Sequence, residues 1–306
     1  MPTTTRSLTI GSRTSNLAMW QTNHIIALLA QTWPDTECRV EPFVTKGDKT
    51  LDQPLPEIGG KGLFTLELED ALRNGRIDLA VHSLKDLPVE NASGVTLGAI
   101  IGRADVRDVL ITANDKKLGS LPVGAIVGTS SLRRQAQLRQ ARPDLDIQSI
   151  RGNVETRIRK VMEGQYDATI LAAAGITRLG LDDKVTQWLP LDVMLPAPGQ
   201  GVLAVQCRAD DMETQRMLSA IHQPEVATAV TAERSFLHHL GGGCATPVAA
   251  YAEWHGDKLH LTGLVAAVDG SKEIRVSGIG TGSWELGAEV AAIALGRGAQ
   301  ELLADG

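Results

Sequence analysis

The stretch "SLTIGSRTSNLAMWQTNHIIALLAQTWPDTECRVEPFVT" (residues 7–45) determines the fold class. Residues 7–12 predict a strand, residues 15–33 a helix that Pro34 ends, and residues 38–45 a second strand. The alternation continues with a predicted amphipathic helix over "LFTLELEDALRNG" (63–75) and a predicted buried strand over "RIDLAVHSL" (76–84). Strands that alternate with helices are typical of an α/β fold.

A second α/β unit is expected from about residue 103. Its predicted strands and helices alternate over residues 123–130, 130–143, 144–152, 153–164 and 166–175. "LPAPGQGVLAVQCR" (195–208) predicts a linker that leads back into a strand, and the remainder predicts a helix, antiparallel hairpins and a closing helix. We therefore expect three domains, formed by residues 1–102 with 202–220, 103–201 and 221–306.

Composition restricts the classes of partner. The 306 residues are 43% hydrophobic and 22% charged, as in an ordinary globular protein. The aromatic share of 3% and the net charge of -6 count against a nucleic-acid partner. We find no signal-peptide pattern and no apolar run of about 18 residues, so we expect a cytoplasmic protein without a membrane partner. Cys38, Cys207 and Cys244 form no disulfide framework, and we expect no metal site.

Arginines are concentrated where predicted elements begin or end. Residues 128–160 contain eight basic and three acidic side chains. Arg133 and Arg134 fall in the first turn of a predicted helix, where each exposed cation opposes the helix dipole at a cost of roughly 0.3–1 kcal/mol. An anion at this position would explain them. A solvated basic face is the alternative.

Three further arginines, Arg13, Arg151 and Arg178, come after predicted strands, and ligands of open α/β sheets bind at the strands' carboxyl ends. Guanidinium groups bind carboxylates or phosphates in a planar, bidentate way. "EIGGKGLF" (57–64) lacks the Ser/Thr of a P-loop, and no GxGxxG opens a helix. The arginines therefore favour a ligand with several carboxylates, bound between the two α/β units.

Two segments offer reactive side chains. "AVHSLKDLP" (80–88) ends a buried strand with Asp86 beside Lys85, which makes Asp86 a candidate catalytic carboxylate; a Lys–Asp pair that caps a turn is the alternative. In "LGGGCATP" (240–247), three glycines leave the Cys244 thiol open to a bulky adduct. A Cys/His nucleophile with His238 or His239 is the alternative there, although a cation preference at the helix end also explains these histidines.

Eight motifs together resemble the porphobilinogen deaminase (hydroxymethylbilane synthase) family. They are "TKGD", "GGKGLF", "DLAVHSLKDLP", "GTSSLRRQAQL", "IRGNVETR", "AAAGITRLG", "LPAPGQG" and "LGGGCATP". The resemblance covers about residue 8 to the end. It implies two α/β domains similar to type 2 periplasmic binding proteins, flanking a cleft, and a small C-terminal α+β domain. It implies a transferase of haem biosynthesis that condenses four porphobilinogen molecules, releases hydroxymethylbilane and works as a monomer.

The resemblance also implies roles for individual residues. Cys244 would carry a dipyrromethane cofactor through a thioether, and Asp86 would be catalytic. The implied cofactor-binding residues are Lys85, Ser131, Arg133, Arg134, Arg151 and Gln200. The implied substrate-binding residues are Arg13, Ser15, Lys61, Ser83, Thr129, Ser130, Arg157 and Arg178. Glu57 departs from the family, in which a basic residue is common before the "GGKG". A two-lobed anion-binding or effector-sensing module of the same fold is the alternative function.

Overall fold

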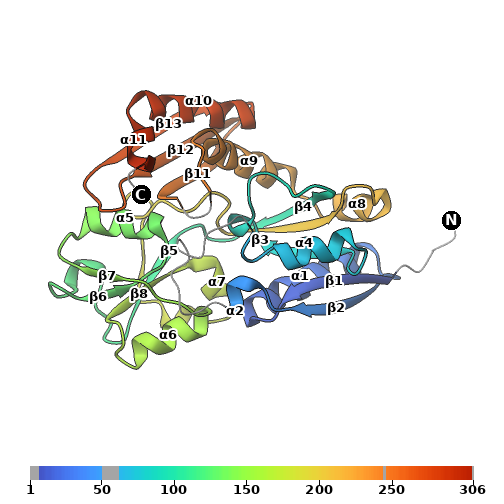
Figure 1. Ribbon diagram of the computed structural model, residues 1–306, viewed down its shortest axis with the longest axis horizontal. Coiled ribbons are helices and arrows are strands. Elements are labelled where there is room, and N and C mark those ends of the chain that lie inside the picture. The colour runs from blue at the N-terminus through green and yellow to red at the C-terminus, as the bar shows by residue number, and fades with distance from the viewer. Residues whose placement is uncertain (1–6, 50–61, 244–245, 305–306) are drawn as a thin grey trace. The chain divides into compact units, whose positions relative to one another are not determined.

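The computed structural model describes residues 7–49, 62–243 and 246–304 (Figure 1). These residues form two compact units. The first contains described residues 7–49, 62–103 and 202–227, and the second contains residues 104–201, 228–243 and 246–304.

The first unit is built on a five-stranded sheet with the order β2-β1-β3-β10-β4. The strands are β1 (Ser7–Arg13), β2 (Glu37–Phe43), β3 (Leu79–Ser83), β4 (Val95–Arg103) and β10 (Val202–Arg208). β1 is parallel to β2 and β3, whereas β10 is antiparallel to β3 and β4. The predicted strands over residues 7–12, 38–45 and 76–84 are confirmed, and the linker at 195–208 does lead back into this sheet.

Several helices accompany this first sheet. They are α1 (Asn16–Thr32), α2 (Lys46–Lys49), α4 (Leu66–Arg73) and α8 (Met212–Ser219). Ser15 begins α1, since its Oγ accepts a hydrogen bond from the amide of Ala18 at 3.3 Å. Ile25 and Leu29 of α1 are fully buried against Leu8 and Leu79 of the sheet. The 3.6-residue spacing of these apolar side chains explains why the helix was predictable from sequence.

The second unit contains a five-stranded sheet with the order β7-β6-β8-β5-β9. Its strands are β5 (Asp108–Thr112), β6 (Ile126–Gly128), β7 (Asp146–Gln148), β8 (Ala168–Ala172) and β9 (Gln187–Trp188). β6 is parallel to β7 and β8, and β5 is antiparallel to β8 and β9. The antiparallel strand therefore has the same position in this sheet as β10 has in the first.

Three helices accompany this sheet: α5 (Leu132–Ala141), α6 (Val154–Met162) and α7 (Ala173–Arg178). The predicted strand over residues 166–175 was wrong at its end, because β8 stops at Ala172 and α7 begins at once. Alanine is the strongest helix former, and the run of alanines favours a helix there. Arg178 is consequently the last residue of a helix and does not directly follow a strand.

The second unit also contains a three-stranded antiparallel sheet, β11 (Val248–His255), β12 (Lys258–Ala266) and β13 (Glu273–Gly280). The helices α9 (Pro224–His239), α10 (Ser283–Gly296) and α11 (Ala299–Ala304) accompany it (Figure 1). Ala249 and Leu264 of this sheet pack with Ala136 of α5 in one apolar cluster. The hairpins and closing helix were predicted, whereas the division into three domains stays a prediction.

Candidate active site

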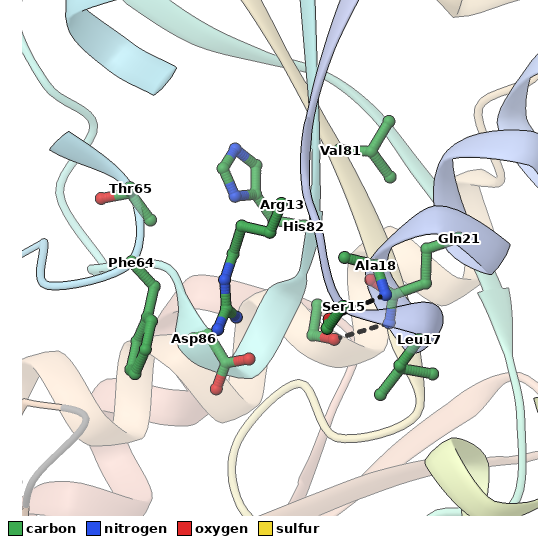
Figure 2. Close-up of a pocket in the computed structure, with 11 residues that line it drawn as sticks. Arg13, Ser15, Leu17, Ala18, Gln21, Phe64, Thr65, Val81, His82 and Asp86 are labelled. Atoms are coloured by element: carbon green, nitrogen blue, oxygen red, sulfur yellow. Dashed lines mark hydrogen bonds between the residues drawn. The ribbon is translucent and has the colours of Figure 1, made fainter. Parts of the chain in front are cut away.

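A pocket of about 70 Å³ lies in the first unit, at the carboxyl ends of β1 and β3. Three segments line it (Figure 2): the end of β1 with the start of α1, the end of β3 with the short 3-10 helix Leu84–Asp86, and the residues just before α4. Its polar lining includes Arg13, Ser15, Gln21, Ser83 and Asp86. Sheets of this type bind ligands at the carboxyl ends of parallel strands, which makes the pocket the candidate active site.

Asp86 is the exposed carboxylate of this pocket. β3 brings it there, because Leu79 and Ala80 are fully buried in the sheet and the chain turns immediately after Ser83. Lys85, in the same turn, is half-buried. The structure therefore brings together Asp86, Arg13, Ser15 and Ser83 of the predicted set.

Arg13 is held on two sides. Its Nε donates to Oδ2 of Asp48 at 3.1 Å, and its Nη2 pairs with the other oxygen of that carboxylate. Its guanidinium carbon lies 4.4 Å from the centre of the Phe64 ring. Burial raises the pKa of Asp48, but Arg13 and Thr45 outweigh this effect and bring the pKa below its usual value. Sequence reasoning missed Asp48 and Phe64, although both lie in the quoted motifs "TKGD" and "GGKGLF".

Ser15, Gln21 and Ser83 present polar groups that are already ordered. Ser15 caps α1, and Nε2 of Gln21 donates to Oγ of Ser83 at 2.9 Å. His82 also lines the pocket but is buried, and burial, followed by the charge of Arg13, lowers its pKa to about 4. His82 is therefore neutral at physiological pH. Gln21 and His82 were not predicted as site residues.

Arg133 and Arg134 surround a fully buried carboxylate in the second unit. Their Nη2 atoms donate to the two oxygens of Asp108, each at 2.8 Å, and Nε2 of Gln200 donates to Oδ1 at 2.9 Å. Their Nη1 atoms donate to the carbonyls of Leu195 and Ile170. The carboxylate of Asp108 is therefore an anion of the kind expected beside these two arginines, and it belongs to the chain itself. Cofactor binding by Arg133, Arg134 and Gln200 stays a prediction.

The hydroxyl groups before α5 differ in their surroundings. Ser130 is buried, and its Oγ contacts Oγ of Ser149 and the carbonyl of Ile150, both at 2.8 Å. Thr129 is also buried, and its Oγ1 accepts from the amide of Ser131 at 3.3 Å. Ser131 is half-buried and begins α5 without a capping bond from its side chain. Of the three, Ser131 has the side chain most accessible to a ligand.

Arg151, Arg157 and Arg178 are half-buried cations in the second unit. Burial lowers the pKa of Arg151 and brings that of Arg178 to about 10. Nη2 of Arg178 donates to the carbonyl of Gly201 at 2.7 Å, and Nε of Arg157 donates to that of Gly152 at 2.8 Å. Since burial disfavours the charged form of Arg151 and Arg178, an anionic ligand would stabilise these two side chains.

Three predicted positions, Glu57, Lys61 and Cys244, lie outside the described residues.

Within the described ranges, no helix is both long and apolar enough to cross a bilayer.

The shared strand order of the two five-stranded sheets and the pocket at the strand ends define an α/β protein with a ligand site at the edge of a sheet. Residues 8–216 match the family described as "Porphobilinogen deaminase, dipyromethane cofactor binding domain", and residues 227–296 match "Porphobilinogen deaminase, C-terminal domain". The chain belongs to the porphobilinogen deaminase family.

Individual relatives agree with this assignment. The chain is 50% identical over 302 residues to the porphobilinogen deaminase of Roseiflexus castenholzii, covering 97% of this chain and 99% of the relative. It is 48% identical over 300 residues to that of Geobacter sulfurreducens, covering 97% and 94%. These matches support the enzyme and not the alternative of a binding or effector-sensing module.

Solved structures of other families are only distantly similar. The methionine binding protein MetQ is 14% identical, with a TM-score of 0.45 and coverage of 72% of this chain and 92% of that one. The BenM effector binding domain with benzoate is 15% identical, with a TM-score of 0.42 and coverage of 72% and 96%.

The chain's polar residues fit the dipyrromethane cofactor of the family. The acetate and propionate groups of pyrroles are carboxylates, and guanidinium is the side chain best shaped to bind them. Arg151 and Arg178 are desolvated cations of this kind, and Nε of Arg133 and of Arg134 is buried without a hydrogen-bond partner in the described structure. The donor set therefore suits a ligand with several carboxylates.

Proposed function

We propose that this chain condenses four porphobilinogen molecules head to tail and releases hydroxymethylbilane, using Asp86 as its catalytic carboxylate. Each condensation forms one carbon–carbon bond and releases one ammonia, and a final water molecule releases the product. The observation that carries the proposal is the exposed carboxylate of Asp86 in a pocket with Arg13, Ser15 and Ser83.

Binding would rest on the cations and hydroxyl groups of the chain. Each porphobilinogen has two carboxylates, so a growing chain needs several bidentate donors. Within the described residues we assign this role to Arg13, Ser15, Ser83, Lys85, Ser131, Arg151, Arg157 and Arg178. The binding of the chain between the two α/β units stays a prediction, as do the cytoplasmic location and the monomeric state.

Catalysis would rest on the fixed charge of Asp86. As the C–N bond of the substrate breaks, positive charge develops on the pyrrole ring, and a carboxylate that accepts the ring N–H stabilises it. Removal of one preorganised electrostatic group of this kind costs roughly 3–4 kcal/mol. When bound through Cys244, the dipyrromethane supplies the primer to which the first porphobilinogen is joined.

Intact mass tests the cofactor assignment. We expect the purified protein to be heavier than its sequence by two substrate-derived pyrroles, and Cys244→Ala to lose that mass. Retention of the adduct by Cys244→Ala would move the attachment to another thiol. A mass equal to that of the bare chain, even after incubation with porphobilinogen, would contradict the proposed function.

Turnover tests the role of Asp86. We expect Asp86→Asn to keep the added mass and to lose roughly a hundredfold or more in kcat, because the amide has no charge to stabilise the ring. Asp70→Asn is the matched control, since Asp70 is a largely exposed carboxylate of the same unit, paired with Arg73. Near-normal activity of Asp86→Asn would remove Asp86 from the mechanism.

A further inference from the structure

The segment Thr45–Asp48 fixes the Arg13 side chain before any ligand binds. Asp48 meets the guanidinium through Nε and Nη2, the two nitrogens on one edge of the group. Phe64 covers one face of the same group, with its ring centre 4.4 Å from the guanidinium carbon. An edge and a face of Arg13 are therefore occupied, and Nη1 is the nitrogen outside the bidentate pair.

Asp48 is itself held in place. Its Oδ2 accepts from the amide of Thr45 at 3.1 Å and from the Thr45 hydroxyl at 2.7 Å. Gly47 is buried beneath Phe64, and a Cβ at Gly47 would lie only 2.2 Å from Cε1 of that ring. The glycine thus permits the close approach that places Phe64 over Arg13. Three side chains and one glycine together determine the position of a single guanidinium.

The position of Arg13 matters because Asp86 lines the same pocket (Figure 2). Among the described residues, Arg13 forms an ion pair with Asp48 and none with Asp86. A guanidinium without a carboxylate partner is attracted to a nearby carboxylate, and more strongly so in a partly desolvated pocket. Loss of Asp48 would therefore leave Arg13 free to pair with Asp86.

We propose that Asp48 is a positioning residue that holds Arg13 against Phe64 and so keeps the Asp86 carboxylate available to the substrate. The proposal rests on the function proposed above. Asp48 is not among the described residues that line the pocket. Its effect on the reaction passes entirely through Arg13, and this dependence can be measured.

The test is a double-mutant cycle with Asp48→Asn and Arg13→Gln. Asparagine keeps the size of Asp48 and removes its charge. We expect Asp48→Asn to lower kcat by roughly ten- to a hundredfold, as for other misplaced active-site groups. In the Arg13→Gln background the same change should alter kcat by less than about twofold, because residues that act as a unit are not additive. Equal losses in both backgrounds would overturn the proposal.

A crystal structure of Asp48→Asn supplies a readout besides activity. We expect the Arg13 guanidinium to leave the Phe64 ring and to pair with Asp86, whereas an unmoved Arg13 would overturn the proposal. If Asp48→Asn does not fold, Gly47→Ala replaces it in the test, because the added Cβ displaces Phe64 and leaves the Asp48 carboxylate intact. A normal kcat for Gly47→Ala with a displaced Phe64 would also overturn the proposal.

Two controls separate this inference from the proposed function. Asp70→Asn removes an exposed partner of Arg73 in the same unit and should leave kcat unchanged. The unsubstituted protein is assayed in parallel. Failure of that protein to convert porphobilinogen would contradict the proposed function, while the position of Arg13 in the Asp48→Asn crystal would still decide the role of Asp48.

Discussion

At the scale of single residues, His82 shows how a pocket-lining side chain affects stability. Burial and the charge of Arg13 lower its pKa to about 4, whereas the pKa of an unfolded histidine is about 6.5. Between these values the unfolded state binds more protons than the folded state, so stability falls as the pH falls through this window. The full difference amounts to about 3 kcal/mol.

We therefore expect His82→Gln to reduce the acid sensitivity of the protein. Between pH 7 and pH 5, the unsubstituted chain should lose about 2 kcal/mol more of its unfolding free energy than His82→Gln does. Urea unfolding at both pH values measures this, with the exposed His238→Gln as the control. If the unsubstituted protein and His82→Gln lose the same unfolding free energy between pH 7 and pH 5, His82 does not titrate as described.

At the scale of elements, the packing of α10 on α9 depends on one glycine. A Cβ at Gly287 would lie 2.5 Å from the carbonyl oxygen of Ala232 and 2.4 Å from Cβ of Ser235, both in α9. Gly287→Ala should therefore lower the unfolding free energy by roughly 1–3 kcal/mol, as overpacking does elsewhere.

Gly296 offers a matched control at the end of the same helix. A Cβ there would have no neighbour within 4 Å, so Gly296→Ala should be neutral or stabilising by up to about 1 kcal/mol. Thermal unfolding of both variants decides the matter. Equal melting temperatures would show that α10 can shift away from α9 at little cost.

At the scale of the whole molecule, Asp108 connects distant parts of the second unit. It lies in β5, its two arginine partners lie in α5, and Gln200 reaches it from the segment before β10. The carboxylate is fully buried, and both guanidinium groups are nearly so. Removal of one partner leaves buried charges without compensation, which typically costs 3–5 kcal/mol.

Asp108→Asn should consequently lower the unfolding free energy by about 3–5 kcal/mol. Asp183→Asn is the control, because Asp183 pairs with Lys184 at the surface and its loss should change stability little. Chemical denaturation of both variants compares them. A small effect of Asp108→Asn would mean that Arg133 and Arg134 do not depend on this carboxylate.

The amino-acid sequence was sufficient to predict the alternation of strands and helices, the return of the chain through residues 195–208 and the place of Asp86 at a strand end. These features are local, since the spacing of apolar side chains and the turn residues encode them within a few positions. Eight motifs in order were also sufficient to predict the family.

The partner of each arginine became known from the folded structure and not from the sequence. Arg133 and Arg134 meet Asp108 across 25 and 26 residues of chain, and Arg13 meets Asp48 across 35. Charge counting shows an excess of cations, but it cannot show which carboxylate the fold brings to each guanidinium. Contacts between distant segments depend on how strands pair and helices pack. The sequence therefore does not distinguish a cation that binds a ligand from one that pairs with a carboxylate of the same chain.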